Sequence, residues 1–258
     1  MDESDCGRGV SDVLGYIMIF GMILTLTFVA TTTGITEISS QQQSEQIATV
    51  ERGFQILDRD FETIQTHKDS RKATPLNIQS GSIGYGEIAT ITIGEWDTSS
   101  NEFTADNTSI ATRTITYQND NTELVYEGGL LFNDRTSRET LSRTDTGFVV
   151  EDTKAVIPVV SLNTPNPDFG VAPSGELVIQ SVYSSDTQTT AARTVTGETL
   201  KIAIESTKPA GWERQLADEG FENVERDGST VRASITVDGT SPETAVLSPT
   251  AIQTDIET

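Results

Sequence analysis

The chain begins with a long run of apolar and uncharged residues. No Asp, Glu, Lys or Arg occurs between Val13 and Thr36. A helix over this run would span about 36 Å, slightly more than the roughly 30 Å hydrocarbon core of a bilayer. The pattern predicts one transmembrane helix over residues 10–38. The alternative, a cleaved secretory signal peptide, fits less well because its apolar core would be only about 7–15 residues long.

A second apolar pattern follows, with a helical period. From Ile47 to Ile64 the apolar residues recur at spacings of three and four, which predicts a narrow apolar seam on an amphipathic helix over residues 39–70. No proline occurs before Pro75, so one near-continuous helix through both patterns is expected to end near Thr66. A separate amphipathic helix after a loop is the alternative. The seam would serve either self-association or packing against the chain's own globular body. Its members are Ile47, Val50, Phe54, Leu57, Phe61 and Ile64.

From Leu76 onward the hydrophobic period changes to two. Several segments alternate apolar and polar residues, and turn clusters rich in Gly, Asn and Asp separate them, which predicts an antiparallel β-sandwich over residues 74–240. One helical segment, Pro209–Gly220, interrupts the strands and ends at a glycine typical of a helix C-cap. The polar tail over 241–258 is expected to be loosely held. The alternating segments include 88–93, 114–117, 177–179, 200–204 and 231–237.

The patterns together predict an α+β fold. Its parts are a long N-terminal helix, transmembrane in its first half, and an all-β antiparallel sandwich with one short helix.

The composition adds a strong charge imbalance. The chain has 39 acidic and 17 basic side chains and a net charge of −22. Phosphates would repel a chain this acidic, so nucleic acid is not an expected partner. The recurrent apolar segments argue against disorder. At about 1 M ionic strength the Debye length falls to about 3 Å, so the acidic surface predicts a protein adapted to high salt.

Side chains suited to catalysis or metal binding are scarce. The chain has one histidine, His67, and one cysteine, Cys6, which cannot by themselves form a metal-ligand set or an activated nucleophile. We therefore expect no enzymatic activity, no cofactor and no metal. One modification motif is present, the glycosylation sequon Asn107-Thr108-Ser109, in a segment expected to be a polar loop. Asn107 is the candidate acceptor.

The N-terminus resembles that of haloarchaeal type IV pilins and pilin-like proteins. Arg8 and Gly9 precede Val10, Asp12 and an uninterrupted apolar helix. In that family a prepilin peptidase cuts after a basic-plus-small pair. The resemblance therefore implies cleavage between Gly9 and Val10, with Arg8, Gly9 and Val10 as the processing site and residues 1–9 as a cytoplasmic leader. It also implies that the apolar helices of several subunits bundle into a filament core.

The rest of the chain resembles a haloarchaeal pilin-like group of unknown function over Tyr126–Phe132, Ile157–Leu162 and the helix that contains Trp212. Many relatives have proline at the position of Asp12. We expect the Asp12 carboxylate to pair with the new α-amino group of a neighbouring subunit during assembly. The alternative role for Asp12 is a helix N-cap.

These observations predict a membrane-anchored pilin-like surface protein, a minor or accessory subunit of a type IV pilus-like assembly. The expected partners are the lipid bilayer, a prepilin peptidase and other pilin-like subunits. The expected location is the cell membrane, with a single pass, a cytoplasmic N-terminus and an extracellular C-terminal domain. The alternative is a permanently anchored cell-surface binding module with a β-sandwich ectodomain, which would have no reason to lose residues 1–9.

Overall fold

The chain divides into two compact units, Met1–Ala48 and Thr49–Thr258. We call the second unit the β domain. The computed structural model describes the backbone of residues 6–68, 71–120, 122–135, 138–141, 147–151, 154–185, 191–235 and 243–257, and their side chains except at 6–12, 29–43, 135, 138–141 and 243.

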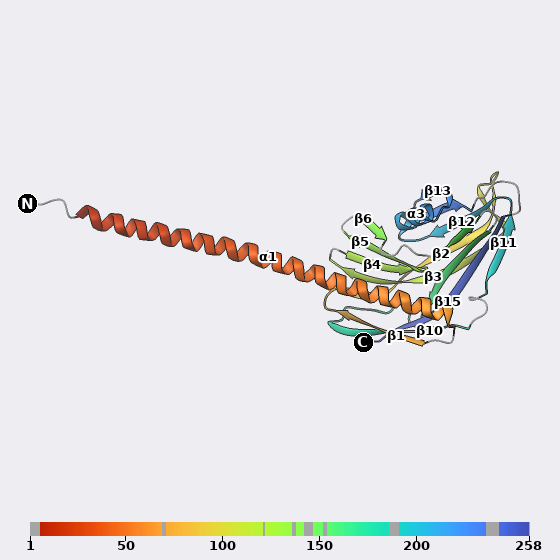
Figure 1. Ribbon diagram of the computed structural model, residues 1–258, viewed down its shortest axis with the longest axis horizontal. Coiled ribbons are helices and arrows are strands. Elements are labelled where there is room, and N and C mark those ends of the chain that lie inside the picture. Colours follow the sequence, from red (N-terminus) through yellow and green to blue (C-terminus); the bar gives the residue numbers. More distant parts are fainter. Residues whose placement is uncertain are drawn as a thin grey trace, which may run out of the picture. The chain divides into compact units, whose positions relative to one another are not determined.

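Within these residues Figure 1 shows a mostly β architecture with two helices. The elements in chain order are α1 (Cys6–Thr66), β1 (Arg71–Ile78), β2 (Ser82–Asp97), β3 (Glu102–Asn119), β4 (Thr122–Glu127), β5 (Leu130–Arg135), β6 (Arg138–Leu141), β7 (Val149–Glu151), β8 (Lys154–Asn163), β9 (Gly170–Val171), β10 (Gly175–Tyr183), β11 (Arg193–Gly197), β12 (Leu200–Glu205), α3 (Pro209–Asp218), β13 (Glu222–Asp227), β14 (Thr230–Ser234) and β15 (Glu243–Glu257).

The first helix, α1, runs without a break from Cys6 to Thr66, as the near-continuous pattern predicts. In the described parts of the chain, no helix combines the length and the apolar character needed to cross a membrane. This finding overturns the predicted transmembrane helix over 10–38 and the predicted single-pass membrane location.

The seam on the second part of α1 packs inside the β domain. Val50, Phe54, Leu57, Phe61 and Ile64 belong to one buried cluster with side chains from both sheets. Of the two roles considered for the seam, the structure therefore supports packing against the chain's own body.

Two contacts show that α1 lies between the sheets. A Cβ at Gly53 would overlap the side chain of Leu76 on β1, so glycine at this position allows close packing. On the other side, the rings of Phe61 and Tyr126 on β4 meet edge to face with centroids 5.0 Å apart. Figure 1 shows this part of α1 between β1 and β4.

Two sheets form the β domain. Sheet A has the order β1-β10-β15-β8-β7, and β11 also pairs with β15. Sheet B has the order β13-β14-β12-β2-β3-β4-β5-β6, and β9 also pairs with β2. Neighbouring strands are antiparallel except β15 and β8, which pair in parallel from Thr244 opposite Lys154 to Gln253 opposite Asn163. A parallel pair needs a crossover connection. Here the chain between β8 and β15 contributes several strands to sheet B before it returns to sheet A. The predicted α+β pilin-like fold with an all-antiparallel sandwich is thus wrong, because the structure is mostly β and sheet A is mixed.

The C-terminal tail is a central strand of sheet A, not the loosely held segment that its polarity predicts. Its residues pair with β8 on one side and with β10 and β11 on the other. Leu247, Ile252 and Ile256 on this strand are buried. The sandwich therefore continues beyond the predicted boundary at residue 240.

Side-chain hydroxyls join the two sheets where β3 crosses β8. The fully buried Thr112 donates a hydrogen bond to the carbonyl of Val160 at 3.0 Å and accepts one from the amide of Leu162 at 3.0 Å. Ser161 donates to the carbonyl of Ala111 at 2.9 Å. These bonds satisfy the backbone of β8 beyond the end of its short neighbour β7, where an unpaired buried amide or carbonyl would be costly.

The short helix α3 confirms the predicted helical segment. Trp212 and Leu216 are fully buried, as expected for residues one turn apart on one face. The helix ends in a Schellman motif: Gly220, with φ of 85°, donates to Ala217 at 3.3 Å, and Phe221 donates to Leu216 at 3.0 Å.

Polar contacts attach α3 to sheet B. The indole of Trp212 donates a hydrogen bond of 2.6 Å to the carboxylate of Glu127, and both side chains are fully buried. Lys208, immediately before α3, makes ion pairs with Glu123 and with Asp134. The positive charge of Lys208 thereby links the start of α3 to one carboxylate on β4 and one on β5.

Candidate functional site

The most unusual surface of the molecule lies on α1. Between Val13 and Phe28, twelve large apolar side chains are each 54–74 % exposed. The five consecutive residues 16–20 are all exposed. Since successive residues point about 100° apart around a helix, the exposed surface covers every side of it. We call residues 13–28 the apolar segment.

The two threonine hydroxyls within this segment do not make it polar. Thr25 donates to the carbonyl of Gly21 and Thr27 donates to the carbonyl of Ile23, both at 2.8 Å. Each hydroxyl is therefore satisfied by its own helix. The surface consequently offers an outside partner little besides apolar contact, and a helix that is apolar on all sides is normally covered.

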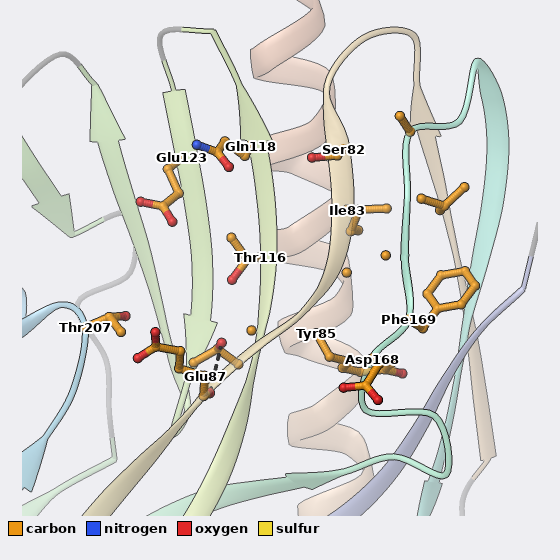
Figure 2. A pocket seen from close by; sticks show the side chains of 16 residues that line it. Ser82, Ile83, Tyr85, Glu87, Thr116, Gln118, Glu123, Asp168, Phe169 and Thr207 are labelled. Atoms are coloured by element: carbon orange, nitrogen blue, oxygen red, sulfur yellow. Dashed lines mark hydrogen bonds between the residues drawn. The ribbon is translucent and has the colours of Figure 1, made fainter.

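A groove of about 520 Å³ is a second candidate site, on sheet B (Figure 2). It lies beside the part of β2 between Gly84 and Thr90. On this edge of β2, β9 pairs with Ile83 and Gly84, and β12 pairs from Thr90 onward. Figure 2 shows Thr116 and Glu123 on one side of it and Asp168 on the other.

A β-bulge shapes the floor of the groove. The register between β2 and β3 shifts between Tyr85 and Ile88. At the bulge, side chains of β3 donate hydrogen bonds to the backbone carbonyls of β2. Arg113 donates to the carbonyl of Gly86 at 3.3 Å, and Thr114 donates to the carbonyl of Glu87 at 3.2 Å. A Cβ at Gly86 would overlap the Thr114 hydroxyl, so the bulge needs glycine there.

The groove is acidic. Glu87, Glu123 and Asp168 line it, and no Lys, Arg or His does. Glu123 forms an ion pair with Lys208, while Glu87 and Asp168 are exposed. The groove would therefore repel anions and admit neutral or cationic groups.

The groove lacks the parts of a hydrolytic site. Its lining includes Ser82 and several threonines but no histidine, lysine or cysteine that could activate them. Across the described residues, no group of three or more His, Cys, Asp or Glu side chains is placed to hold a metal ion.

One titratable side chain beside the groove is perturbed. The ring of Tyr85 packs toward the core that contains α1. Burial raises the pKa of its hydroxyl above the ordinary value, and interactions with the hydroxyls of Thr164 and Thr254 offset part of this effect.

The residues predicted from the N-terminal motif lie on the backbone of α1. Arg8, Gly9, Val10 and Asp12 fall within its helical range, but their side chains are outside the described part. Processing at Gly9-Val10 and the assembly role of Asp12 therefore stay predictions.

Asn107 lies on β3 and not in the polar loop that its surroundings predict. It is exposed and pairs with Gly94 of β2, and its amide donates to the carbonyl of Thr104 at 2.6 Å. Its glycosylation stays a prediction.

Sequence reasoning missed the groove. The signal available was Gly84-Tyr85-Gly86, two glycines inside a run that otherwise reads as a strand. Glycine inside a strand marks a bulge or a close approach of another backbone. Here one glycine serves each purpose: Gly84 is approached by the backbone of Phe169, and Gly86 forms part of the bulge.

Comparison with known proteins gives one match. No curated protein and no solved structure is significantly similar to the chain. No pilin or pilus protein is matched, so the predicted membrane-bound pilus assignment has support neither from the fold nor from the comparisons. A model of a family of unknown function, DUF7289, matches residues 8–255. This match covers nearly the whole chain, and the protein therefore belongs to that family of unknown function.

Proposed function

We propose that this protein is a non-enzymatic structural subunit whose apolar segment associates with the same segment in other copies. The β domains are then carried on the resulting assembly. The observation that carries the proposal is the all-round exposure of the twelve large apolar side chains between residues 13 and 28.

The energetics favour several neighbours over one. Covering about half of each side chain gains roughly 1 kcal/mol per residue, or about 10 kcal/mol for the segment. That gain is comparable to the estimated cost of about 4–15 kcal/mol for losing the freedom of two separate molecules. A single partner would leave the far side of the helix exposed. A bundle in which each helix has several neighbours covers all sides and is therefore more stable than a dimer.

Two features of the sequence support this role. The run from Val13 to Thr36 has no charge, so neighbouring helices would not repel each other through it. The resemblance of the N-terminus to pilins, whose helices bundle, also supports an assembling role.

The test compares two matched substitutions by light scattering and electron microscopy, in detergent-free buffer at about 1 M salt, where the Debye length is about 3 Å. Leu24→Glu places a charge on the apolar segment at a residue 54 % exposed. Ile88→Glu makes a similar change at a residue 53 % exposed in the β domain. We expect the natural chain and Ile88→Glu to form large assemblies and Leu24→Glu to stay monomeric.

Two results would overturn the proposal. One is a natural chain that stays monomeric at all concentrations, including one that enters lipid vesicles without self-association. The other is a Leu24→Glu variant that assembles as well as the natural chain.

A further inference from the structure

The two units of the chain have opposite tendencies toward association. The apolar segment carries no charge, whereas residues 49–258 contain 33 acidic and 16 basic side chains, a net charge of −17. Each copy that joins an assembly through its apolar segment therefore brings a strongly acidic domain with it.

Seven basic side chains in the described part of the β domain make contacts inside their own chain. Several form ion pairs, and others bind backbone carbonyls or an aromatic ring. Arg113 and Arg193 donate to the carbonyls of Gly86 and Ser109, and Lys201 lies 4.5 Å from the ring centre of Trp96. The ion pairs are Lys72 with Asp60, Lys208 with Glu123 and Asp134, Arg226 with Glu213, and Arg232 with Asp227.

The acidic side chains, in contrast, are widely exposed. Glu222 and Glu225 on β13 and Glu102 and Asp106 on β3 face solvent. When two β domains approach, their net charges are therefore of the same sign and repel each other.

We infer that ionic strength controls the association of the apolar segments, with dilute salt keeping the copies apart and molar salt allowing them to assemble. This inference rests on the proposed function. A domain of this size has a radius of gyration of about 17 Å. The Debye length is about 30 Å at 0.01 M, about 10 Å at 0.1 M and about 3 Å at 1 M. Repulsion thus acts across a whole domain at the lowest salt concentration and only between touching side chains at the highest.

The experiment measures the mass of the full chain by light scattering from about 0.01 M to about 1 M salt. The buried Trp96 and Trp212 report by fluorescence that the β domain stays folded at each point. A charge variant replaces six exposed carboxylates by lysine, which changes the net charge from −22 to −10, since each replacement adds two positive charges. The positions are Glu87, Glu102, Asp106, Asp168, Glu222 and Glu225.

All six positions lie in the β domain, whose charge changes from −17 to −5. Because repulsion scales with the square of the charge, this variant should feel about tenfold less of it. We expect its midpoint for assembly to lie at a salt concentration several-fold lower than that of the natural chain. A control exchanges Glu for Asp and Asp for Glu at the same six positions, and its midpoint should not move. The control separates charge from a general strengthening of apolar contacts by salt, which would act equally on all three proteins.

The outcomes separate the two ideas. If the natural chain assembles equally at all salt concentrations, or if the lysine variant keeps the natural midpoint, ionic control is wrong and the structural role stands. If no variant assembles at any concentration, the structural role itself is wrong.

Discussion

Replacing Thr112 by valine should weaken the joint between the two sheets. The two side chains have nearly the same shape, so the change removes the hydroxyl and leaves no cavity. Its loss leaves the amide of Leu162 and the carbonyl of Val160 without the bonds of 3.0 Å that they now make. Each buried backbone group left unpaired costs about 1–3 kcal/mol, and the added methyl returns about 1 kcal/mol. The expected loss in the free energy of unfolding is therefore about 3 kcal/mol.

Thr116→Val is the matched control for this prediction. Thr116 lies on the same strand, but it is half-buried at the groove. Its replacement should change the free energy of unfolding by less than about 0.5 kcal/mol. Denaturant unfolding at about 1 M salt, followed by tryptophan fluorescence, measures both variants. If Thr112→Val loses no more stability than Thr116→Val, the bonds between β3 and β8 do not hold the sheets together and the reasoning is refuted.

Two further changes test other parts of the β domain. Burial raises the pKa of Tyr85 in the folded state, so the unfolded chain ionises first: the stability from this group is complete below about pH 10 and is lost as the pH rises further. Tyr85→Phe should therefore have a flatter decline above pH 10 than the natural chain in denaturant titrations, and an identical decline would contradict this. Trp212→Phe removes the 2.6 Å hydrogen bond to the buried Glu127 and should cost about 2–4 kcal/mol by the same assay; a loss below about 0.5 kcal/mol would show that this bond does not hold α3 to the sheet.

Regular patterns were the part of the fold that the sequence predicted well. The seam from Val50 to Ile64 is buried, because a spacing of three and four places all its members on one face of α1. The alternating segments 88–93 and 200–204 are in β2 and β12. The short helix α3 ends at Asp218, and Gly220 caps it with a φ of 85°, as the predicted glycine C-cap requires. In each case the local pattern and the tertiary environment demand the same residues.

The predictions failed where tertiary pairing decides the structure. β15 was not recognised because Pro249 and several threonines interrupt its alternation, yet in a central strand its neighbours on both sides supply the hydrogen bonds. The parallel pairing of β15 with β8 joins residues about ninety positions apart, and no local pattern records it. Asn107 was expected in a loop because Asp106 and Asn107 are polar, but on a long exposed hairpin polar residues are common on the outer face.

The first half of α1 has to be interpreted differently from the second. A helix that packs against one body needs apolar residues on one face, and the part from Val50 to Ile64 has only such a seam, which both sheets cover. The segment from Val13 to Phe28 is apolar on every face and exposed on every face. Leaving twelve large apolar side chains in water is unfavourable, and charged residues on one face would relieve it at little cost to the helix. Their absence is the feature of this segment that the proposed bundle explains, because neighbouring copies of the helix would cover its whole circumference.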